Sequence, residues 1–423
     1  MGTSFRPYEP DQALLLPPVL SEWLTEDHLA YFVSDTVDQL DLSAFYQRYD
    51  GDGRRRQPYE PRMMVKLLIY AYATGVFSSR RIARRLEEDV AFRVLAAGNF
   101  PAHRTICEFR LQHLQEFQDL FVRVVQLAQE LGLIKLGTLA IDGSKLKANA
   151  SKHKAMSYGR MKEEEQRLAR EIAALTARAS AEDAEEDARY GADRRGDEIP
   201  AELARRASRL EQIRAAKLRL EQRQAAEDRS RGREPGDDQR RGGPGTKRFE
   251  RRCGVPEDRK QENFTDPDSR IMKSGAGFEQ CYNAQIAVDG ESQLIVASDV
   301  CQVISDAPQL LPMYDAAKRN VKLKPRRVLA DAGYRSEAGL RGLERRRVRG
   351  YVALGREGRA SRRVLGQDLK ATRRMERSLK SARGKRWYRK RKWMVEPPFG
   401  WIKSVLGFRQ FSLRGQRKVR GEW

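Results

Sequence analysis

The sequence predicts an α/β fold in which a mixed sheet is preceded by a helical domain and interrupted by a helical hairpin. Three observations support this prediction. Short helical patterns separated by turns fill the first 136 residues. An apolar, strand-like run then leads to Asp142, and further runs of this kind begin at Tyr282. The long stretch between them is rich in Ala, Glu, Arg and Leu, which favours helices and indicates an insertion into the sheet.

Residues 1–136 form the predicted helical domain. Pro61 opens one helix, which stops near Gly75, because proline suits a first helical turn and glycine suits a helix end. A serine pair caps a second helix from Arg80 to Leu86, and a third candidate starts at His103. Short helices with clustered arginines are typical both of a helix-turn-helix and of a bundle with a solvated basic face, so both interpretations stay open. The candidate DNA contacts in this domain are Arg80, Arg81, Arg84 and Arg104.

The predicted sheet begins with the alternating apolar run from Leu133 to Ile141, and the insertion follows it. Arg160–Arg178 and Pro200–Asp228 carry leucines and isoleucines three, four and seven residues apart, which predicts a helical hairpin or a short coiled coil. Ser230–Gln261 is rich in Gly, Pro, Arg and Asp, and we expect a flexible linker there. The predicted domains are a helical DNA-binding domain at 1–136, the first part of the core at 137–158, the insertion and linker at 159–262, and the remainder of the core at 263–423.

The second part of the core continues the alternation of strands and helices. Tyr282–Asp289 and Leu294–Val300 are predicted to be strands joined by a turn at Asp289-Gly290. We then expect a helix at Ala307–Arg319 and strands at Arg327–Asp331 and Gly350–Leu354, followed by a basic tail with several aromatic residues from about Leu379.

Charge points to the class of partner. The 423 residues carry a formal net charge of +23, which favours a polyanion because each Lys or Arg that neutralises a phosphate releases a bound counterion. Nucleic acid is the leading candidate. No apolar run reaches 18 residues, and the four cysteines and four histidines show no zinc-ligand spacing. We therefore expect a cytoplasmic protein that contacts DNA, without a membrane span.

Three acidic residues stand out in this basic chain: Asp142, Asp331 and Glu396. Each has an ordinary explanation alone, since Asp142 could lie in a turn, Asp331 could cap a helix near Ser336, and Glu396 could pair with a nearby lysine. Together they suggest a site for Mg²⁺, which prefers oxygen ligands and commonly acts on phosphates. Two strands side by side would bring both aspartates to one sheet edge, and Glu396 would come from a helix packed against that sheet.

Motifs along nearly the whole chain carry a family resemblance. They are Phe5-Arg-Pro-Tyr, Pro101-Ala-His-Arg-Thr-Ile, Ala140-Ile-Asp-Gly-Ser-Lys-Leu-Lys-Ala-Asn-Ala-Ser, Asn263-Phe-Thr-Asp-Pro-Asp-Ser-Arg-Ile-Met-Lys, Tyr282-Asn-Ala-Gln, Ala330-Asp-Ala-Gly-Tyr, Val395-Glu-Pro-Pro-Phe-Gly-Trp-Ile-Lys and Phe408-Arg-Gln-Phe-Ser-Leu-Arg-Gly. The chain resembles bacterial insertion-sequence transposases of the DDE class. That resemblance implies a ribonuclease H-like core with a helical N-terminal domain and a helical insertion.

The resemblance also implies a function and a site. Asp142, Asp331 and Glu396 would be the catalytic ligands of Mg²⁺ or Mn²⁺. The partners would be double-stranded transposon ends and target DNA, and synapsis of two ends suggests a homo-oligomer. The expected activity is cleavage at the ends and strand transfer, with the protein on the nucleoid when active.

The resemblance further implies DNA contacts around Glu396. Lys403 keeps the expected interval of seven residues from Glu396, which is about two helical turns, so both should lie on one helix face. Tyr388 and Arg391 keep their mutual spacing but lie one residue too far upstream, whereas Lys392 is in register with Glu396. Either Arg391 or Lys392 is therefore the expected basic contact.

Two departures from the family pattern shape the alternatives. Ala102 precedes His103, which is a weaker helix start than the usual Ser or Asp. The sequence ends at Trp423, where similar transposases continue with another helix, so we expect a truncated copy with weak or no activity. The alternatives are a DNA-binding remnant without catalysis and a metal-dependent nuclease that cuts DNA without joining it.

Overall fold

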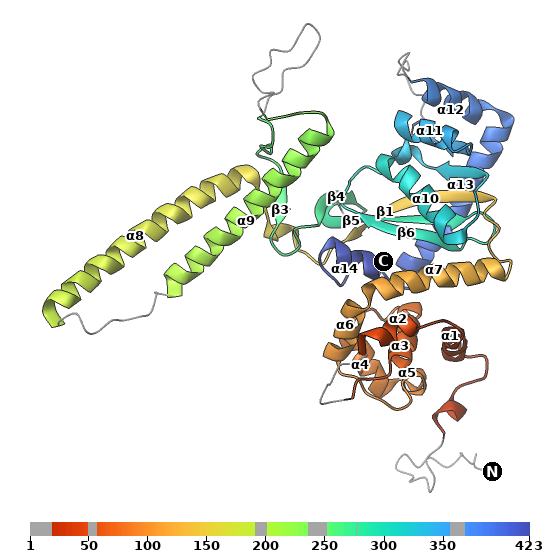
Figure 1. The fold of residues 1–423 in the computed structure, drawn as a ribbon, viewed down its shortest axis with the longest axis horizontal. Coiled ribbons are helices and arrows are strands. Elements are labelled where there is room, and N and C mark those ends of the chain that lie inside the picture. Colours follow the sequence, from red (N-terminus) through yellow and green to blue (C-terminus); the bar gives the residue numbers. More distant parts are fainter. Residues whose placement is uncertain (1–18, 50–56, 191–200, 236–251, 276, 356–368) are drawn as a thin grey trace, which may run out of the picture.

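The computed structural model describes residues 19–49, 57–190, 201–235, 252–275, 277–355 and 369–423. Figure 1 shows three parts: a helical N-terminal domain, a core built on a sheet, and a long helical hairpin that projects away from the core. The Phe5-Arg-Pro-Tyr motif and the centre of the predicted linker lie outside the described residues. No helix within the described ranges is both long and apolar enough to span a membrane.

The N-terminal domain packs short helices around one hydrophobic core. Pro61 begins α3 as predicted, and the Glu60 carboxylate accepts a hydrogen bond from the backbone N–H of Met63 at 2.6 Å. Ile82 and Leu86, one turn apart, are fully buried. The helices are α1 (Leu29–Asp38), α2 (Ser43–Tyr46), α3 (Pro61–Ala73), α4 (Ser79–Glu88), α5 (Val90–Leu95), α6 (His103–Gln112) and the connecting α7 (Leu114–Glu130). The sequence analysis missed α5, which is only six residues long.

A mixed sheet forms the core, as predicted, with the strand order β4-β5-β1-β7-β8 and β6 paired to β5. The central β1 runs antiparallel to β5 and parallel to β7, and β7 runs parallel to β8. This is the sheet expected of a ribonuclease H-like core. The strands are β1 (Thr138–Lys147), β4 (Arg270–Ser274), β5 (Gly277–Asp289), β6 (Ile295–Cys301), β7 (Arg327–Ala330) and β8 (Arg349–Val352).

The predicted bounds of the first strand were wrong. β1 starts at Thr138, because Leu136 has a positive φ of 46° that breaks the extended chain before it. The strand then continues past Asp142 to Lys147, since Gly143 to Lys147 pair with β5 in unbroken register. Asp142 therefore lies in mid-strand, and Asp142-Gly143 is not a turn. Local glycine and polar residues suggested a strand end, but pairing with a long neighbour overrides them.

Helices cover both faces of the sheet. Leu139 and Ile141 of β1 pack in a core with α7, α10 (Leu310–Val321) and α11 (Glu337–Arg345). Ala140, which points to the opposite face, packs against Met394 and Val395 of α13 (Ala382–Gly400). Alternate residues along β1 thus face two different helical layers. The remaining helices of this part are α12 (Lys370–Lys380) and α14 (Gln416–Glu422).

The predicted hairpin is present, with longer helices than expected. It consists of α8 (Tyr158–Tyr190) and α9 (Ala201–Ser230), which run antiparallel (Figure 1). Glu165 pairs with Arg214 and Lys217, both at 3.0 Å, and Glu171 pairs with Arg206. The apolar seam between the helices contains Met161, Leu168, Leu210, Ile213, Ala216 and Leu220.

The hairpin joins the core through a small two-stranded sheet. β2 (Ala155–Ser157) and β3 (Gln261–Asn263) pair antiparallel, so the chain leaves and rejoins the core at neighbouring points. The buried Glu262 of β3 accepts ion pairs from Arg219 and Arg223 of α9, which ties the hairpin to this small sheet.

The C-terminal segment packs onto the core. A π-helical turn at Trp401–Val405 follows α13 directly, and α14 then lies against α7 and β6. The indole N–H of Trp423 donates to the carbonyl oxygen of Gln285 at 3.0 Å, and its ring packs among phenylalanine side chains. Those phenylalanines are Phe399, Phe408 and Phe411.

Candidate active site

Asp142 and Asp331 lie side by side. The parallel pairing of β1 with β7 ends at Ile141 opposite Ala330, and each aspartate directly follows its member of that pair. Ile141 and Ala330 pack in the core with α10 and α11. Because neighbouring residues of a strand point to opposite faces, Asp142 and Asp331 lie on the face that α13 covers. The sheet register thus brings together two acidic residues that are far apart in the sequence.

The Asp142 side chain is 20% exposed, so its carboxylate is largely buried. It accepts the backbone N–H of Gly143 at 2.8 Å and Nη1 of Arg391 at 3.0 Å. Burial raises the pKa of Asp142 to about 6, and the charge of Asp331 acts in the same direction, while Arg391 and the Gly143 N–H oppose it. Such a carboxylate gains strongly from a nearby cation.

Asp331 combines a site position with a structural role. It caps the short 3₁₀-helix η6 (Ala332–Tyr334), and its Oδ1 accepts the N–H of Gly333 at 2.8 Å. The alternative of a helix cap is therefore partly right. However, α11 is capped by Ser336 itself, through a 3.0 Å hydrogen bond from the Gly339 N–H. The cap at η6 uses only one of the two carboxylate oxygens of Asp331.

Helix α13 brings Arg391 to this pair. The Arg391 side chain is 11% exposed and reaches Asp142, whereas Lys392 is exposed. Tyr388, one turn earlier, is partly buried in the same cluster as Val395. Of the two basic candidates in this register, the structure brings Arg391 to the aspartates.

Glu396 does not join the two aspartates in this structure. Val395 is fully buried against the sheet, and the next residue in an α-helix is turned about 100° away, so Glu396 is exposed. Among the described residues, no group of three Asp, Glu, His or Cys side chains is placed to hold one metal ion. Two adjacent aspartates suit a hard cation, but the predicted set of three carboxylates is not assembled here.

Lys403 approaches the aspartates from the π-helical turn. Its Nζ donates to Oγ of Ser144, which lies two residues after Asp142 on the same face of β1. Burial lowers the pKa of Lys403, and the opposing charge of Asp142 compensates only in part. We expected Lys403 and Glu396 to share one helix face. In an α-helix, two residues seven positions apart lie on the same face. Lys403 lies in a π-helical turn, which has more residues per turn, so this spacing no longer places it on the face of Glu396.

The four arginines predicted to contact DNA lie in the N-terminal domain. Arg80, Arg81 and Arg84 are exposed on α4, and Arg104 is exposed near the start of α6. Arg84 forms an exposed ion pair with Glu88 at 3.3 Å. The buried Ile82 and Leu86 occupy the opposite side of α4, so these arginines form a basic outer surface.

A polar cluster behind the aspartates was missed in the sequence analysis. Oδ1 of Asp306 accepts hydrogen bonds from Lys145 at 2.8 Å, Asn283 at 2.7 Å and Gln285 at 2.9 Å. One sequence feature could have revealed it. Asn283 and Gln285 are two residues apart in the predicted strand Tyr282–Asp289, so both point to the same face.

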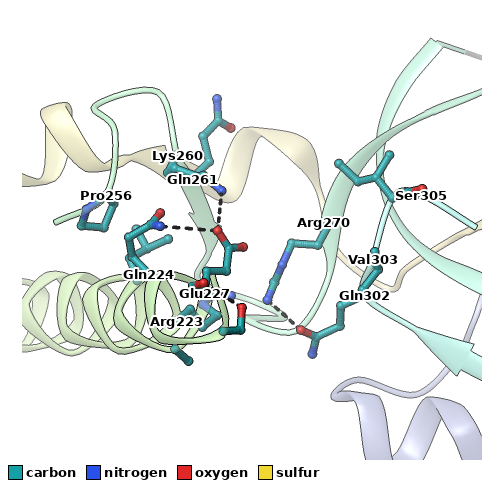
Figure 2. A pocket seen from close by; sticks show the side chains of 14 residues that line it. Arg223, Gln224, Glu227, Pro256, Lys260, Gln261, Arg270, Gln302, Val303 and Ser305 are labelled. Atoms are coloured by element: carbon teal, nitrogen blue, oxygen red, sulfur yellow. Dashed lines mark hydrogen bonds and ion pairs between the residues drawn. The ribbon is translucent and has the colours of Figure 1, made fainter. Parts of the chain in front are cut away.

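A cavity of about 600 Å³ lies where the hairpin meets the core (Figure 2). Arg223 of α9 and Arg270 of β4 line it, and Arg270 donates to Oε1 of Gln302 at 2.8 Å. Burial lowers the pKa of Arg223 to about 10, assisted by the charges of Arg270 and Arg219. Ser305 lines this cavity, but neither Asp306 nor the two aspartates of the candidate site do.

Two regions of the chain match known protein families. Residues 243–423 match the family model of the transposase DDE domain, and residues 18–112 match a second transposase domain family, DUF772. Neither match includes β1, although this strand is the centre of the sheet and carries Asp142. No curated protein and no solved structure matches the chain.

The mixed sheet and the two family matches define a transposase of the DDE class. With its N-terminal transposase domain, the chain belongs to the DDE transposases of insertion sequences.

Proposed function

We propose that this transposase cleaves transposon ends and joins them to target DNA with Mg²⁺ or Mn²⁺ held by Asp142 and Asp331. The observation that carries the proposal is the adjacency of these two carboxylates on parallel strands. We propose a two-metal reaction: when bound, one divalent ion would activate the attacking water or 3′-hydroxyl, and the other would stabilise the leaving oxygen. Glu396 is proposed as the third carboxylate on family resemblance alone, since α13 leaves it exposed.

The basic side chains around the pair have roles that follow from their contacts. Arg391 neutralises Asp142 through a 3.0 Å ion pair, so a cation that binds Asp142 competes with this guanidinium. Once displaced, Arg391 is free to contact a DNA phosphate, for which a planar guanidinium is well suited. Lys403, beside Ser144, adds a second positive charge on the same face. We propose Tyr388 and the exposed Lys392 as further DNA contacts.

DNA binding at the transposon end is assigned to the N-terminal domain. Its exposed arginines on α4 and α6 are the proposed phosphate contacts. Synapsis of two ends requires two copies of the site, so we propose that the active form is a homo-oligomer bound to the bacterial nucleoid.

The test of the catalytic assignment is Asp142→Asn. We expect Mg²⁺-dependent cleavage of end DNA to fall by more than about 100-fold, since losing groups that merely support metal ligands already costs 10–100-fold. Binding of the same DNA, measured by fluorescence anisotropy without metal, should stay unchanged. Asp315→Asn is the matched control, because Asp315 pairs with Arg346 on the outer side of α10. Wild-type cleavage by Asp142→Asn would refute the assignment.

A joining assay separates the remaining alternatives. Uncut end DNA and, separately, end DNA with a free 3′-hydroxyl are incubated with a target plasmid and Mg²⁺. A transposase gives joined products, a nuclease gives only cut DNA, and a DNA-binding remnant gives neither. Glu396→Gln in the same assay tests the third carboxylate, and we expect loss of both cutting and joining.

A further inference from the structure

We infer that Asp306 is a positioning residue that holds both aspartates of the proposed site through the opposite face of the sheet. This inference rests on the proposed function of Asp142 and Asp331. The Asp306 cluster consists of Lys145, Asn283, Gln285, Asp306 and Tyr334.

Asp306 is the hub of this cluster. Its Oδ1 accepts three hydrogen bonds of 2.7 to 2.9 Å, from one ammonium group and two side-chain amides. Asn283 and Gln285 are fully buried, and Gln285 also donates to Oδ1 of Asn283 at 2.8 Å. Hydrogen bonds to an ionised acceptor are stronger than neutral ones, and a buried network of them fixes the geometry of its members.

The cluster lies directly beneath the backbone of Asp142. A Cβ added to Gly143 would clash with Nε2 of Gln285 and would lie only 3.0 Å from Oδ1 of Asp306. Gln285 and Asp306 can therefore lie this close to the backbone only because residue 143 is a glycine. Because the Gly143 N–H also donates to Asp142, the position of that carboxylate depends on the support below Gly143.

The same carboxylate also reaches the turn that carries Asp331. A Cβ added to Gly333 would lie 3.0 Å from Oδ2 of Asp306 and 3.0 Å from Oδ1 of Asp331. The two oxygens are thus no more than about 6 Å apart, with only a glycine between them. Tyr334, the next residue, is fully buried and donates its hydroxyl proton to Oε1 of Gln285. Through Gln285, the Asp306 carboxylate is therefore linked to both strand segments.

The cluster accounts for sequence motifs that the three catalytic carboxylates leave unexplained. Lys145 belongs to Asp-Gly-Ser-Lys, Asn283 and Gln285 to Tyr-Asn-Ala-Gln, and Tyr334 to Asp-Ala-Gly-Tyr. Lys145, Asn283 and Gln285 meet at Asp306, just before α10, and Tyr334 joins them through Gln285. The Lys145 charge offsets that of Asp306, so the cluster contributes geometry more than charge.

The first test is Asp306→Asn, with Mn²⁺ alone as the probe. We expect the affinity for Mn²⁺, measured by electron paramagnetic resonance of the free ion, to fall about tenfold, as for other groups that orient metal ligands. The Mg²⁺ concentration for half-maximal cleavage should rise by a similar factor. DNA binding and the circular dichroism spectrum should not change, and Asp315→Asn should match the wild type in every measurement.

Two further variants separate positioning from charge. Asp306→Asn combined with Lys145→Met removes the lysine charge left unpaired by the single change. Positioning predicts that Mn²⁺ binding stays weak, and recovery to the wild-type affinity would overturn the inference. Gly333→Ala keeps every charge but places a methyl group between Asp306 and Asp331, and we expect the same weakening.

The outcomes distinguish this inference from the proposed function. If Asp306→Asn folds and binds Mn²⁺ as tightly as the wild type, the positioning role is wrong even when Asp142→Asn is inactive. If Asp306→Asn does not fold, Gly333→Ala decides, and wild-type Mn²⁺ affinity in that variant rejects the role. Failure of the proposed function appears separately, as cleavage by Asp142→Asn.

Discussion

Asp142 is a buried acid whose neighbours act on its charge in opposite directions. Burial and Asp331 raise its pKa to about 6, well above the 3.8 of an ordinary aspartate, although Arg391 and the Gly143 N–H stabilise the ionised form. The folded protein therefore binds this proton more tightly than the unfolded chain does. Below about pH 4 both states are protonated, and above about pH 6 the folded state must bury the charge.

This predicts a pH-dependent loss of stability in the metal-free protein. As the pH rises from 4 to 6, the contribution of Asp142 to the free energy of unfolding should fall by roughly 3 kcal/mol, since one pKa unit corresponds to about 1.4 kcal/mol. Urea unfolding with a chelator, at several pH values, measures it. Asp142→Asn removes the titration, so the difference between the two proteins isolates this residue. A constant difference across this range would contradict the prediction.

The adjacency of Asp142 and Asp331 was predictable from the sequence, while their catalytic role stays a prediction. Asp142 and Asp331 were identified from apolar runs, and the parallel register brings them together. The orientations of Glu396 and Lys403 could not be predicted, because they depend on which side of α13 packs on the sheet and on a π-helical turn. Asp306 was missed because its partner Lys145 lies 161 residues away.

At the scale of elements, α12 is held by a carboxylate from another helix. Glu337 of α11 accepts the N–H groups of Ala371 and Thr372 at 2.8 and 2.9 Å, at the free N-terminal end of α12. Burial alone would raise the pKa of Glu337, but these hydrogen bonds outweigh it and lower the pKa to about 2. The contact fixes α12, which leads directly into α13 and Arg391.

Replacing Glu337 should therefore loosen this end of the core. We expect Glu337→Gln to cost about 1–2 kcal/mol of stability at pH 7, the usual range for a lost helix cap. The wild-type advantage should vanish as the pH falls from about 4.5 to 2. The pKa of Glu337 is lowered in the folded state, so its carboxylate stabilises the fold only while it is ionised. Denaturant unfolding at pH 7 and pH 3 checks both points.

Glu344→Gln is the matched control on the same helix. Glu344 pairs with Arg374 in an exposed ion pair, which should be worth less than about 1 kcal/mol. Equal losses in the two variants would show that the cap at α12 has no special weight.

Long helices and strands with a clear periodic pattern were predictable from the sequence. Strands that form only through pairing with a distant strand were not. The hairpin helices α8 and α9 and the strands β5 and β6 follow from spacing and turn residues. The end of β1 was misplaced because Gly143, Ser144 and Lys145 have low intrinsic strand preference and are held by β5. The short β2 and β3 have no pattern of their own and form only because they meet.

On the scale of the whole molecule, α4 and α6, which carry the exposed arginines, lie apart from the core strand β1 (Figure 1). If Arg80, Arg81, Arg84 and Arg104 contact phosphates, their joint replacement by alanine should weaken binding to end DNA. It should also reduce the slope of log affinity against log salt by up to about 3 to 4, at roughly 0.9 per phosphate contact. Fluorescence anisotropy at several salt concentrations gives this slope.

Arg48 and Arg62 provide the control for that experiment. They lie in the same domain but pair with Glu116 and Asp38, so their replacement should leave the salt slope unchanged. If replacing Arg48 and Arg62 changed the salt slope as much as replacing the four predicted contacts, the proposed DNA-binding face would be wrong. The predicted domain boundaries stay predictions.

The pairing of β2 with β3 has a consequence for how such proteins diversify. Ser157 and Gln261 lie opposite each other, so residues 158–260 form a closed excursion that begins and ends at one place. The register of β1 with β5 is set elsewhere and does not depend on the length of that excursion. We therefore expect that segments of different length can be inserted at this junction without shifting the register of β1, and with it the position of Asp142.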